Sequence, residues 1–509
     1  MADGDQAIRD VLKGAGVIYV GLFLELVIAF VAQVIAARYL SVSDFGGLTA
    51  GTALLDIGAI VAGLGLASGL TRYLPRVAKD EKRMLAGVTV AVTAVTSLAL
   101  GVVVALAAPF IASEVFGNSA VTPSIRIFGA AIPFATLLNV AVGGIRGQEL
   151  SFYRVVVKNI VHPIGRITLV VVAVLYGFEQ AGVAGAYAVP YVLSALIALL
   201  LLYRSLPRSG SSVDRTLVSE ITRYSLPFTV SGISGFIYRS LDIFVILYFL
   251  GDAATGIYGV AYAAVSFMGM FSTAFNYLGS PIASKLEDDG NVNDALRMFG
   301  LGARWLVIAS VCALVPLGVF ATEFITVIYQ SKYAGGGLAL TILAVGFAVK
   351  NVLSIHGPLL EALGRSKTLS VNSAVAAVSN VALNLLLIPV LGIIGAALAT
   401  VASFLLRDGL AVIQVYRSLG RTPLTRQTVQ PLAAAVPFVA ATAFVAPSIP
   451  TTILWLLAIT AVVAGGYVIT VLVLFGLSDT EVMVIRSAQE RFGLEFGPVD
   501  WLIRHLPDR

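Results

Sequence analysis

The stretch LAGVTVAVTAVTSLALGVVVALAA, residues 85–108, follows Lys82 and Arg83 and contains no charged side chain. An apolar run of this length crosses the hydrocarbon core of a bilayer as one α-helix, which needs about 20 residues. Thirteen other apolar runs, separated by charged and turn residues, have the same character. We therefore predict fourteen membrane-spanning helices: 15–39, 47–70, 85–108, 122–145, 155–177, 182–203, 226–250, 256–283, 299–321, 337–360, 368–390, 393–416, 428–446 and 452–476.

The composition of the whole chain agrees with this pattern. Of the 509 residues, 58% are apolar and only 12% are charged, whereas soluble domains are nearer half apolar and a quarter charged. The mean hydropathy is +0.94. The sequence thus predicts an all-α polytopic membrane protein, and it argues against a soluble enzyme, a nucleic-acid-binding domain and a disordered chain.

Basic residues are distributed unevenly between the loops. With the amino terminus placed inside, 26 of the 33 Lys and Arg residues lie in inner segments and three, Arg38, Arg126 and Lys332, lie in outer segments. Cytoplasmic loops carry such an excess of Lys and Arg, so both termini are expected to be cytoplasmic. Residues 2–13 and 478–509 mix charged with apolar side chains, which predicts segments lying on the inner membrane surface.

The sequence matches itself when it is shifted by 210 residues. Two sets of residues carry the match: Tyr39, Leu40 and Gly46 with Phe249, Leu250 and Gly256, and Gly182, Gly185 and Ala186 with Gly392, Gly395 and Ala396. Six predicted helices lie in each period, and an even number preserves orientation, so the halves are expected to be parallel repeats. This divides the chain into an amino-terminal lobe (1–206), a carboxy-terminal lobe (207–418), two extra helices (419–477) and a cytoplasmic interfacial tail (478–509).

The loops leave no room for an enzyme. None exceeds roughly 20 residues, so a membrane glycosyltransferase or polymerase has no place for its catalytic domain, and no G-x-x-x-x-G-K-[ST] motif is present to bind a nucleotide. Gly65 and Gly69 lie in a predicted span, where their spacing indicates a close-packing helix face. The single cysteine, Cys312, excludes an intramolecular disulfide or a cysteine metal cluster. We expect no enzymatic activity, cofactor, metal ion, nucleotide or nucleic acid.

Several charged side chains fall inside the predicted spans. Arg166, Arg239 and Lys350 lie near the middle of the fifth, seventh and tenth spans, so three cations share one depth. A charge at this depth costs from about 2.5 kcal/mol upward, which makes each one a candidate for function. We expect these three to bind an anionic phosphate in a cavity. Three acids inside spans are candidate coupling or structural residues: Glu25, Asp56 and Asp242.

Some intramembrane charges have structural alternatives. Arg239 and Asp242, three residues apart on one helix, have the spacing of an ion pair. Arg407, near the inner end of the twelfth span, can reach lipid phosphates with its long side chain. His162 shares a helix face with Arg166, where it either contributes a titrating group or satisfies a backbone group freed by the proline that follows it.

Three segments carry a family resemblance: ARYLSVSDFGG at 37–47, SLPFTVSGISGFIYRSLDIFVILYFLGDAATGIYGVAY at 225–262 and NVALNLLLIPVLGIIGAALATVAS at 380–403. They closely resemble the polysaccharide-export flippases of the multidrug/oligosaccharidyl-lipid/polysaccharide superfamily, and the run from Asn380 to Thr400 is the most specific. The resemblance implies two six-helix lobes around a central cavity, with alternating access by a rocking motion.

The resemblance also implies a cargo. It is an oligosaccharide linked through phosphate or pyrophosphate to a polyprenyl carrier, moved from the cytoplasmic to the outer leaflet of the cell membrane for cell-surface polysaccharide or glycoprotein biosynthesis. The expected partners are the bilayer and the glycosyltransferases or polymerase of the same pathway.

Two alternatives remain. One is a drug or organic-cation antiporter of the superfamily, driven by Na⁺ or H⁺ through Glu25, Asp56 or Asp242. The other is a membrane scaffold of a glycan assembly complex that transports nothing. The fourteen-helix count favours the flippase over the antiporter, for which twelve helices are usual, and the three mid-membrane cations have no evident use in a scaffold.

The predicted orientation can be tested by labelling single cysteines in a chain that carries Cys312→Ala. An impermeant thiol reagent applied to intact cells should label the outer set and leave the inner set unlabelled, because basic residues collect on the cytoplasmic side. The outer set is Ser119→Cys, Asp252→Cys and Ser448→Cys, and the inner set is Ser211→Cys, Asn291→Cys and Thr422→Cys. Labelling of the cysteine at position 211 or 291 contradicts the span assignment.

Overall fold

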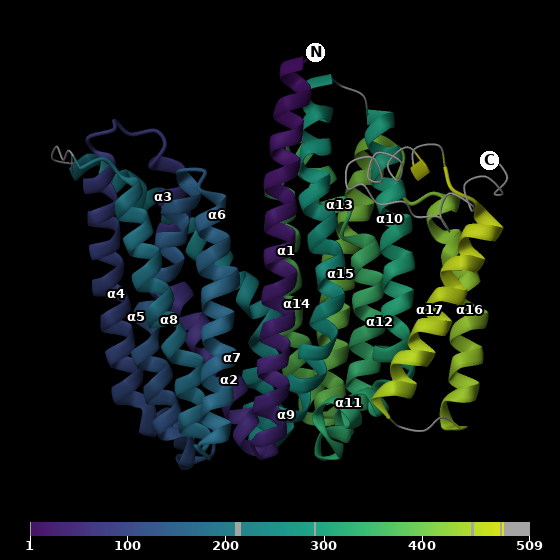
Figure 1. Cartoon of the computed structure of the whole chain (residues 1–509), viewed down its shortest axis with the longest axis horizontal. Helices are drawn as coiled ribbons and strands as arrows, with labels where there is room; N and C mark the ends of the chain where they lie inside the picture. The colour runs from purple at the N-terminus through teal and green to yellow at the C-terminus, as the bar shows by residue number, and fades with distance from the viewer. Residues whose placement is uncertain (1, 209–214, 290–291, 449–451, 479–480, 483–509) are drawn as a thin grey trace. The chain divides into compact units, whose positions relative to one another are not determined.

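The structure is a computed structural model, and it describes residues 2–208, 215–289, 292–448, 452–478 and 481–482. All regular secondary structure in these ranges is helical, which confirms the predicted all-α fold (Figure 1). The α-helices are α1 (Ala2–Tyr39), α2 (Val42–Ala62), α3 (Leu66–Tyr73), α4 (Lys82–Phe110), α5 (Thr122–Gly147), α6 (Ser151–Arg154), α7 (His162–Leu175), α8 (Gln180–Ser205), α9 (Arg215–Asp289), α10 (Val292–Leu314), α11 (Ala321–Tyr329), α12 (Gly337–Leu353), α13 (His356–Ala362), α14 (Ser366–Leu391), α15 (Ile393–Leu419), α16 (Arg426–Val445) and α17 (Ile453–Phe475). The π-helices are η1 (Ile111–Val115), η3 (Val155–Val161) and η4 (Val315–Val319), and the 3₁₀ turns are η2 (Ser119–Val121), η5 (Ser331–Gly336) and η6 (Ala446–Ser448).

Thirteen helical segments within the described residues are long and apolar enough to span a membrane. One of them, Ser219–Thr273, has 55 residues because α9 joins the two spans predicted at 226–250 and 256–283. The backbone leaves helical geometry between these spans at Gly251, where φ is 81°, a value that glycine adopts without a steric penalty. The prediction of about fourteen spans is therefore confirmed.

Three predicted segments differ in detail from the structure. α1 is one continuous helix, so residues 2–13, predicted as a separate surface segment, extend the first span. The second span, predicted at 47–70, consists of α2 and α3, because the backbone at Leu64 and Gly65 is left-handed and interrupts the helix. The predicted surface tail, 478–509, lies almost entirely outside the described residues.

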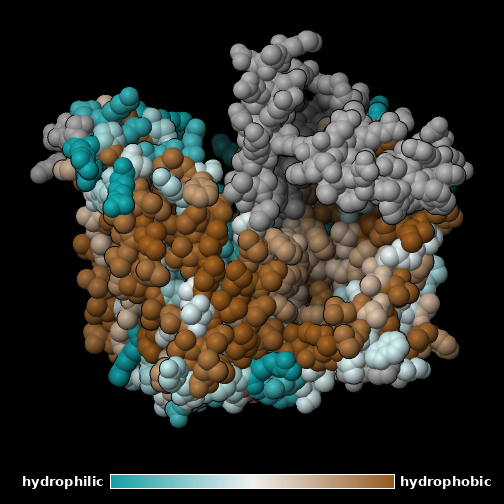
Figure 2. All heavy atoms as spheres, in the orientation of Figure 1, coloured by the Kyte–Doolittle hydropathy of each residue, from teal (hydrophilic) through white to brown (hydrophobic). Residues whose placement is uncertain are grey.

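The pattern of α4 is that of a helix in lipid. Small and hydroxyl residues are buried at every fourth position: Thr89, Thr93, Ser97 and Gly101. Large apolar residues elsewhere on the helix are exposed: Val95, Leu98, Val102, Val103 and Leu106. A helix on the surface of a soluble protein shows the reverse. Figure 2 shows the resulting band of apolar side chains over the helices at its left, with hydrophilic side chains at the rims.

The described chain forms two compact units. The first consists of the described residues up to Ala263 with Tyr329–Gly336 and Ser373–Ser403, and the second consists of Ala264–Ile328, Gly337–Asn372 and the described residues from Phe404 onward. The lobe boundaries that the sequence repeat predicts after residues 206 and 418 stay predictions.

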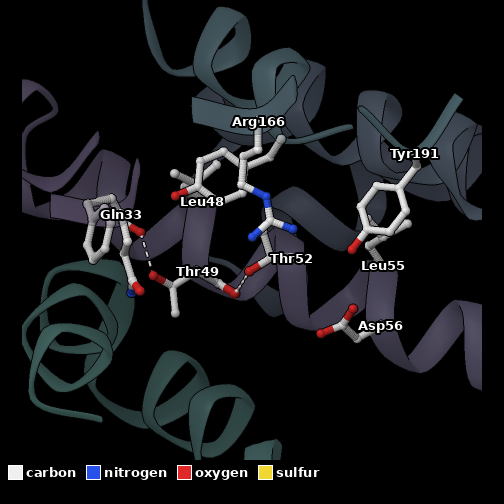
Figure 3. A pocket seen from close by; sticks show the side chains of 10 residues that line it. Gln33, Leu48, Thr49, Thr52, Leu55, Asp56, Arg166 and Tyr191 are labelled. Carbon is white, nitrogen blue, oxygen red and sulfur yellow. Dashed lines mark hydrogen bonds between the residues drawn. The ribbon is translucent and has the colours of Figure 1, made fainter. Parts of the chain in front are cut away.

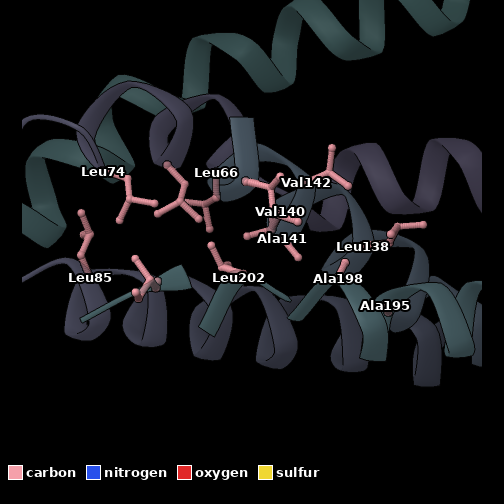
Figure 4. Packing of buried hydrophobic residues seen from close by; sticks show 14 of the residues in the cluster. Leu66, Leu74, Leu85, Leu138, Val140, Ala141, Val142, Ala195, Ala198 and Leu202 are labelled. Carbon is pink, nitrogen blue, oxygen red and sulfur yellow. The ribbon is translucent and has the colours of Figure 1, made fainter. Parts of the chain in front are cut away.

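In the first unit, α3, α4, α5 and α8 pack around one apolar cluster, and α4, α5 and α8 run side by side (Figures 1 and 4). Members of the cluster include Leu70, Leu85, Leu138, Ile145 and Leu202. Glycine allows close approach of the backbones, since a Cβ at Gly143 of α5 would lie 2.5 Å from the carbonyl oxygen of Ala67 in α3. This packing fixes α3, and with it the second part of the second span, against its neighbours.

In the second unit, the last two helices are packed against α10. The shared apolar cluster contains Val307, Val311, Ala434, Tyr467 and Val471. Beyond the end of α17, Glu481 accepts a hydrogen bond from the guanidinium of Arg304 on α10 at 3.0 Å, and both side chains are buried. The helices predicted as an appendage are thus tied to α10 by apolar packing and by a buried ion pair.

The 210-residue repeat has a structural counterpart inside the first unit. A Cβ added at Gly46 would overlap the carbonyl oxygen of Asp252, and one added at Gly256 would overlap that of Val42. Val42 and Asp252 are themselves 210 residues apart, so the contact is reciprocal, as it is at a two-fold axis. α2 and α9 therefore cross at glycines that occupy equivalent positions in the two repeats.

Neither glycine can accept a Cβ unless a backbone moves. Gly46→Ala and Gly256→Ala should each lower the thermal unfolding temperature in detergent, by an amount that corresponds to the roughly 1–3 kcal/mol of an overpacked contact. Gly185→Ala is the matched control, since a Cβ there meets open space in the described part of the chain. Equal unfolding temperatures for the three variants contradict the crossing.

Candidate functional site

A cavity of about 190 Å³ opens inside the first unit. Its walls come from α1, α2, α7 and α8, and they consist of Gln33, Phe45, Leu48, Thr49, Thr52, Leu55, Asp56, Arg166, Tyr187 and Tyr191. Figure 3 shows the guanidinium of Arg166 and the carboxylate of Asp56 projecting into this space from different helices. Two of the residues that the sequence singled out thus line one polar cavity among apolar spans.

Arg166 is held by its neighbours. Its Nη2 lies 2.8 Å from Nε2 of His162, and because arginine only donates, this histidine nitrogen is the acceptor. The guanidinium lies 5.1 Å from the ring centroid of Tyr187, within cation–π range, and the side chain of Tyr191 lies beside it (Figure 3). The buried Nε of Arg166 has no hydrogen-bond partner among the described residues. One donor of a fixed cation therefore remains to be satisfied.

The local backbone explains this placement. The π-helix η3 precedes α7, and π-turns are rare features that concentrate at functional sites. Pro163 lies in the first turn of α7, and the backbone of Val161 and His162 before it is helical, so η3 continues into α7 without a break. The ring of His162 packs on that of Tyr191, with centroids 4.3 Å apart. His162 is thereby fixed in the position from which it orients Arg166.

The acids predicted in the first two spans both face cations. Glu25 of α1 accepts a hydrogen bond from the amide of Asn159 and lies within electrostatic range of Arg166. Asp56 of α2 lies within electrostatic range of Arg166 and Arg239. Two of the three predicted cations thus act electrostatically on one carboxylate.

Asp242 does not pair with Arg239, although their spacing allows it. The Asp242 carboxylate is 2% exposed and accepts hydrogen bonds from the hydroxyls of Tyr258 and, at 3.2 Å, of Thr400. Arg239 is exposed, and its Nε donates to the carbonyl oxygen of Gly235 at 3.3 Å. The ion-pair alternative is therefore wrong for the described structure, in which Asp242 belongs to a buried cluster of hydroxyls.

Lys350 lies on α12 in the second unit. Its Nζ is 4.6 Å from the ring centroid of Phe347 and 4.2 Å from that of Phe404. Two aromatic faces thus stabilise the ammonium group within the spans by cation–π interaction. That Lys350 shares a cavity with Arg166 and Arg239 stays a prediction.

Arg407 lies near the middle of α15, and that it reaches lipid phosphates stays a prediction. Its Nε lies 2.7 Å from Oδ1 of Asp408, the next residue on α15. Arg304 and Glu481 form an ion pair at 3.0 Å. Neither pair lines the cavity of the first unit.

The cavity also contains polar residues that the sequence did not single out: Gln33, Thr49, Thr52, Tyr187 and Tyr191. They are uncharged, and a search for charges at membrane depth passes over them. The spacing of Tyr187 and Tyr191, four residues apart on one helix, places them on one face and is the signal that could have drawn attention to α8.

The fold and the cavity define a multi-pass membrane transporter. The family described as "Polysaccharide biosynthesis protein" matches residues 11–286. The chain belongs to this family, and the predicted family resemblance is confirmed; the match includes the segments 37–47 and 225–262. It is a glycan-biosynthesis transporter of the flippase type and not an enzyme.

Relatives occur among archaeal membrane proteins. The "Probable flippase AglR" of Haloferax volcanii is 26% identical over 57% of this chain and 59% of its own length. The "Probable low-salt glycan biosynthesis flippase Agl15" of the same organism is 26% identical over 36% of this chain and 39% of its own. An uncharacterized membrane protein of Methanocaldococcus jannaschii, MJ1068, is 23% identical over 77% of this chain and 81% of its own.

Two solved structures show the same fold. The lipid II flippase MurJ in an inward closed conformation superposes with a TM-score of 0.73 at 14% identity, covering 89% of this chain and 98% of that chain. A multidrug resistance MATE family transporter of the MOP superfamily, in an inward-facing conformation, gives a TM-score of 0.64 at 16% identity, covering 78% of this chain and 94% of that chain. The fold is thus shared across the superfamily.

The partners of Asp242 can be tested by thermal unfolding of purified protein in detergent. Tyr258→Phe and Asp242→Asn should each destabilise the chain by about 1–3 kcal/mol, because each leaves a buried polar group without its partner. The changes in unfolding free energy should be strongly non-additive in the double variant, since both substitutions remove the same hydrogen bond. Arg239→Gln is the control, and its change in unfolding free energy should add to that of Asp242→Asn. If the effects of Asp242→Asn and Arg239→Gln are non-additive while those of Asp242→Asn and Tyr258→Phe are additive, the hydroxyl cluster around Asp242 is contradicted.

Proposed function

We propose that the chain translocates a polyprenyl-(pyro)phosphate-linked oligosaccharide from the cytoplasmic to the outer leaflet of the cell membrane by alternating access. Such an amphiphile does not cross a bilayer unaided, because its polar head group must give up its hydration. A polar cavity within the spans replaces part of that hydration while the polyprenyl tail stays in lipid. The product then serves cell-surface polysaccharide or glycoprotein biosynthesis.

The observation that carries this proposal is the fixed guanidinium of Arg166. It is oriented by His162 and Tyr187, it lines a cavity, and its Nε has no hydrogen-bond partner among the described residues. The planar fork of a guanidinium matches phosphate oxygens in two parallel hydrogen bonds. The hydroxyls of Thr49 and Thr52 line the same cavity; they donate to the carbonyl oxygens of Phe45 and Thr49, and each would have to rotate to donate to an anion.

The size of the cavity supports a site for the anionic linkage alone. Pockets that enclose a whole drug-sized ligand measure about 300–1,000 Å³, and the volume of about 190 Å³ is smaller. A phosphate or pyrophosphate group fits such a space, whereas the sugars and the carrier lie outside it. In this proposal Arg239 and Lys350 complete the phosphate-binding set once alternating access brings them to the cargo.

We assign the coupling of transport to an ion gradient to the acidic residues within the spans. Asp242 is surrounded by the hydroxyl oxygens of Tyr258 and Thr400, and oxygen donors are the ligands that hard cations prefer. Na⁺ or H⁺ bound at this carboxylate is therefore our proposal for the driving ion, with Asp56 assigned to the cargo cavity and Glu25 to the contact of α1 with Asn159.

A drug or organic-cation antiporter is the main alternative. Asp56 and the aromatic rings of Tyr187 and Tyr191 are groups that attract a cation. Arg166 in the same cavity repels one, and the match to the polysaccharide family favours the flippase. A scaffold that transports nothing has no use for a fixed guanidinium beside a cavity.

The test compares neutral variants in cells that lack the wild-type gene. Arg166→Gln, Arg239→Gln and Lys350→Gln should each leave protein levels near normal and reduce export about 10- to 100-fold, the loss expected for one hydrogen bond to a charged group. The lipid-linked precursor should accumulate on the cytoplasmic side. Arg126→Gln is the matched control, an exposed arginine near the start of α5. Normal surface glycan in all three cavity variants rejects the proposal.

Conservative variants at the same positions separate the two kinds of cation. Arg166→Lys and Arg239→Lys should impair export, because an ammonium group lacks the two-pronged geometry of a guanidinium. Lys350→Arg should be tolerated, since a guanidinium also stacks between the rings of Phe347 and Phe404. If instead Lys350→Arg impairs export while Arg166→Lys and Arg239→Lys are tolerated, the phosphate contact belongs to Lys350.

A further inference from the structure

Four basic residues follow one another at intervals of four along the fifth span: Arg154, Lys158, His162 and Arg166. They run from α6 through η3 into α7. Twelve residues at 1.5 Å each cover about 18 Å, more than half of the roughly 30 Å hydrocarbon core. The set, which we name the basic ladder, therefore links the inner end of the span to the cavity at Arg166.

The π-helix keeps the ladder on one side of the span. In an α-helix of 3.6 residues per turn, a spacing of four drifts by about 40° at each step. The wider i→i+5 turns of η3 rotate the chain less per residue and offset part of that drift. Arg154, Lys158 and Arg166 all act electrostatically on one carboxylate, that of Glu25.

Glu25 is the acid that faces the ladder. It belongs to α1, which packs along η3 and α7. Its carboxylate accepts a hydrogen bond from Asn159, a residue that is 2% exposed, and among the cations that act on it Lys158 is the strongest. The other acid close to the ladder is Asp56, which faces Arg166 from α2. A carboxylate thus lies against the middle of a cationic path.

We propose that the basic ladder is the track along which the phosphate group of the lipid-linked cargo reaches Arg166, and that Glu25 is the internal counter-anion which this phosphate displaces. The inference rests on the proposed function and adds the residues that carry the cargo inward. Lys158 is the residue that the cargo meets between the inner end and the cavity, since it is exposed, whereas His162 is buried.

A counter-anion that the cargo displaces helps the protein to release its cargo and begin a new transport cycle. Cations at membrane depth are costly without an anionic partner, and Glu25 provides one whenever the cavity is empty. When the phosphate arrives, it takes over the interaction with Lys158 and Arg166. When the phosphate leaves, the return of Glu25 compensates the lost charge beside Lys158 and Arg166, so release is less opposed.

The experiment measures binding of a short-chain polyprenyl phosphate to the purified full chain in lipid nanodiscs. Lys158→Gln should weaken binding about tenfold, the effect of losing about 1.4 kcal/mol of charge interaction. Glu25→Gln should strengthen binding several-fold and slow dissociation, because a competitor has been removed. Arg204→Gln is the matched control, an exposed arginine in the last turn of α8, and should bind as the wild type does.

Two further arms make the result decisive. Lys158→Glu, at an exposed position that tolerates substitution, should weaken binding more than Lys158→Gln, which keeps the test valid if Glu25→Gln is poorly folded. Inorganic pyrophosphate distinguishes a lipid headgroup from a free anion. Binding of pyrophosphate as tight as that of the polyprenyl phosphate, with the same dependence on Lys158, overturns a lipid track and indicates a site for free anions.

The outcomes also separate this inference from the proposed function. If export depends on Arg166 but Lys158→Gln and Glu25→Gln bind the polyprenyl phosphate as the wild type does, the ladder is overturned and the flippase proposal stands. If Glu25→Gln weakens binding of the polyprenyl phosphate, Glu25 does not compete with the phosphate, and its assignment as the counter-anion is overturned. If the wild-type chain binds no polyprenyl phosphate, the proposed function and the ladder are both overturned.

Discussion

A charged or hydrogen-bonding group inside hydrocarbon has no water to bind, and this constraint decides most features of the chain. It makes every described span a helix, which satisfies its own backbone. It directs the hydroxyls of Thr89 and Ser97 in α4 to carbonyl oxygens one turn earlier. It also requires that each charge within a span be surrounded by particular neighbours, so those neighbours distinguish one charge from another.

The intramembrane charges meet the constraint in three ways. Asp242 is enclosed by hydroxyls, and Lys350 lies between two aromatic rings. Arg166 is oriented by His162 and by tyrosines of α8, yet it retains a donor without a partner among the described residues and lines a cavity. Arg166 thus differs from Asp242 and Lys350 in keeping a buried donor that the described residues do not satisfy, which is why our proposal places the anion at Arg166.

Glycines of the second span form close backbone contacts on both sides of the residues of α2 that line the cavity. α2 crosses α9 at the reciprocal contact of Gly46 with Gly256, and α3 meets α9 at Gly65 and Gly69, where an added Cβ would overlap Ser225. Asp56 and the cavity lie between these two contacts along the chain. The segment that lines the cavity is thus held at both ends by close backbone contacts, and under the proposed alternating access one of them would open while the other holds.

The sequence by itself determined the number and order of the spans, the repeat, the family and the position of Arg166 and Arg239, because apolar runs, glycine spacing and charge at depth are local properties. It did not determine which side chains form hydrogen bonds or ion pairs with these charged residues. Asp242 has the right spacing to pair with Arg239, but in the folded chain it bonds to Tyr258, which lies beyond the break at Gly251 in α9, and to Thr400 of α15. Spacing along one helix defines a face, whereas the helix packed against that face depends on the whole chain, and only the folded structure decides it.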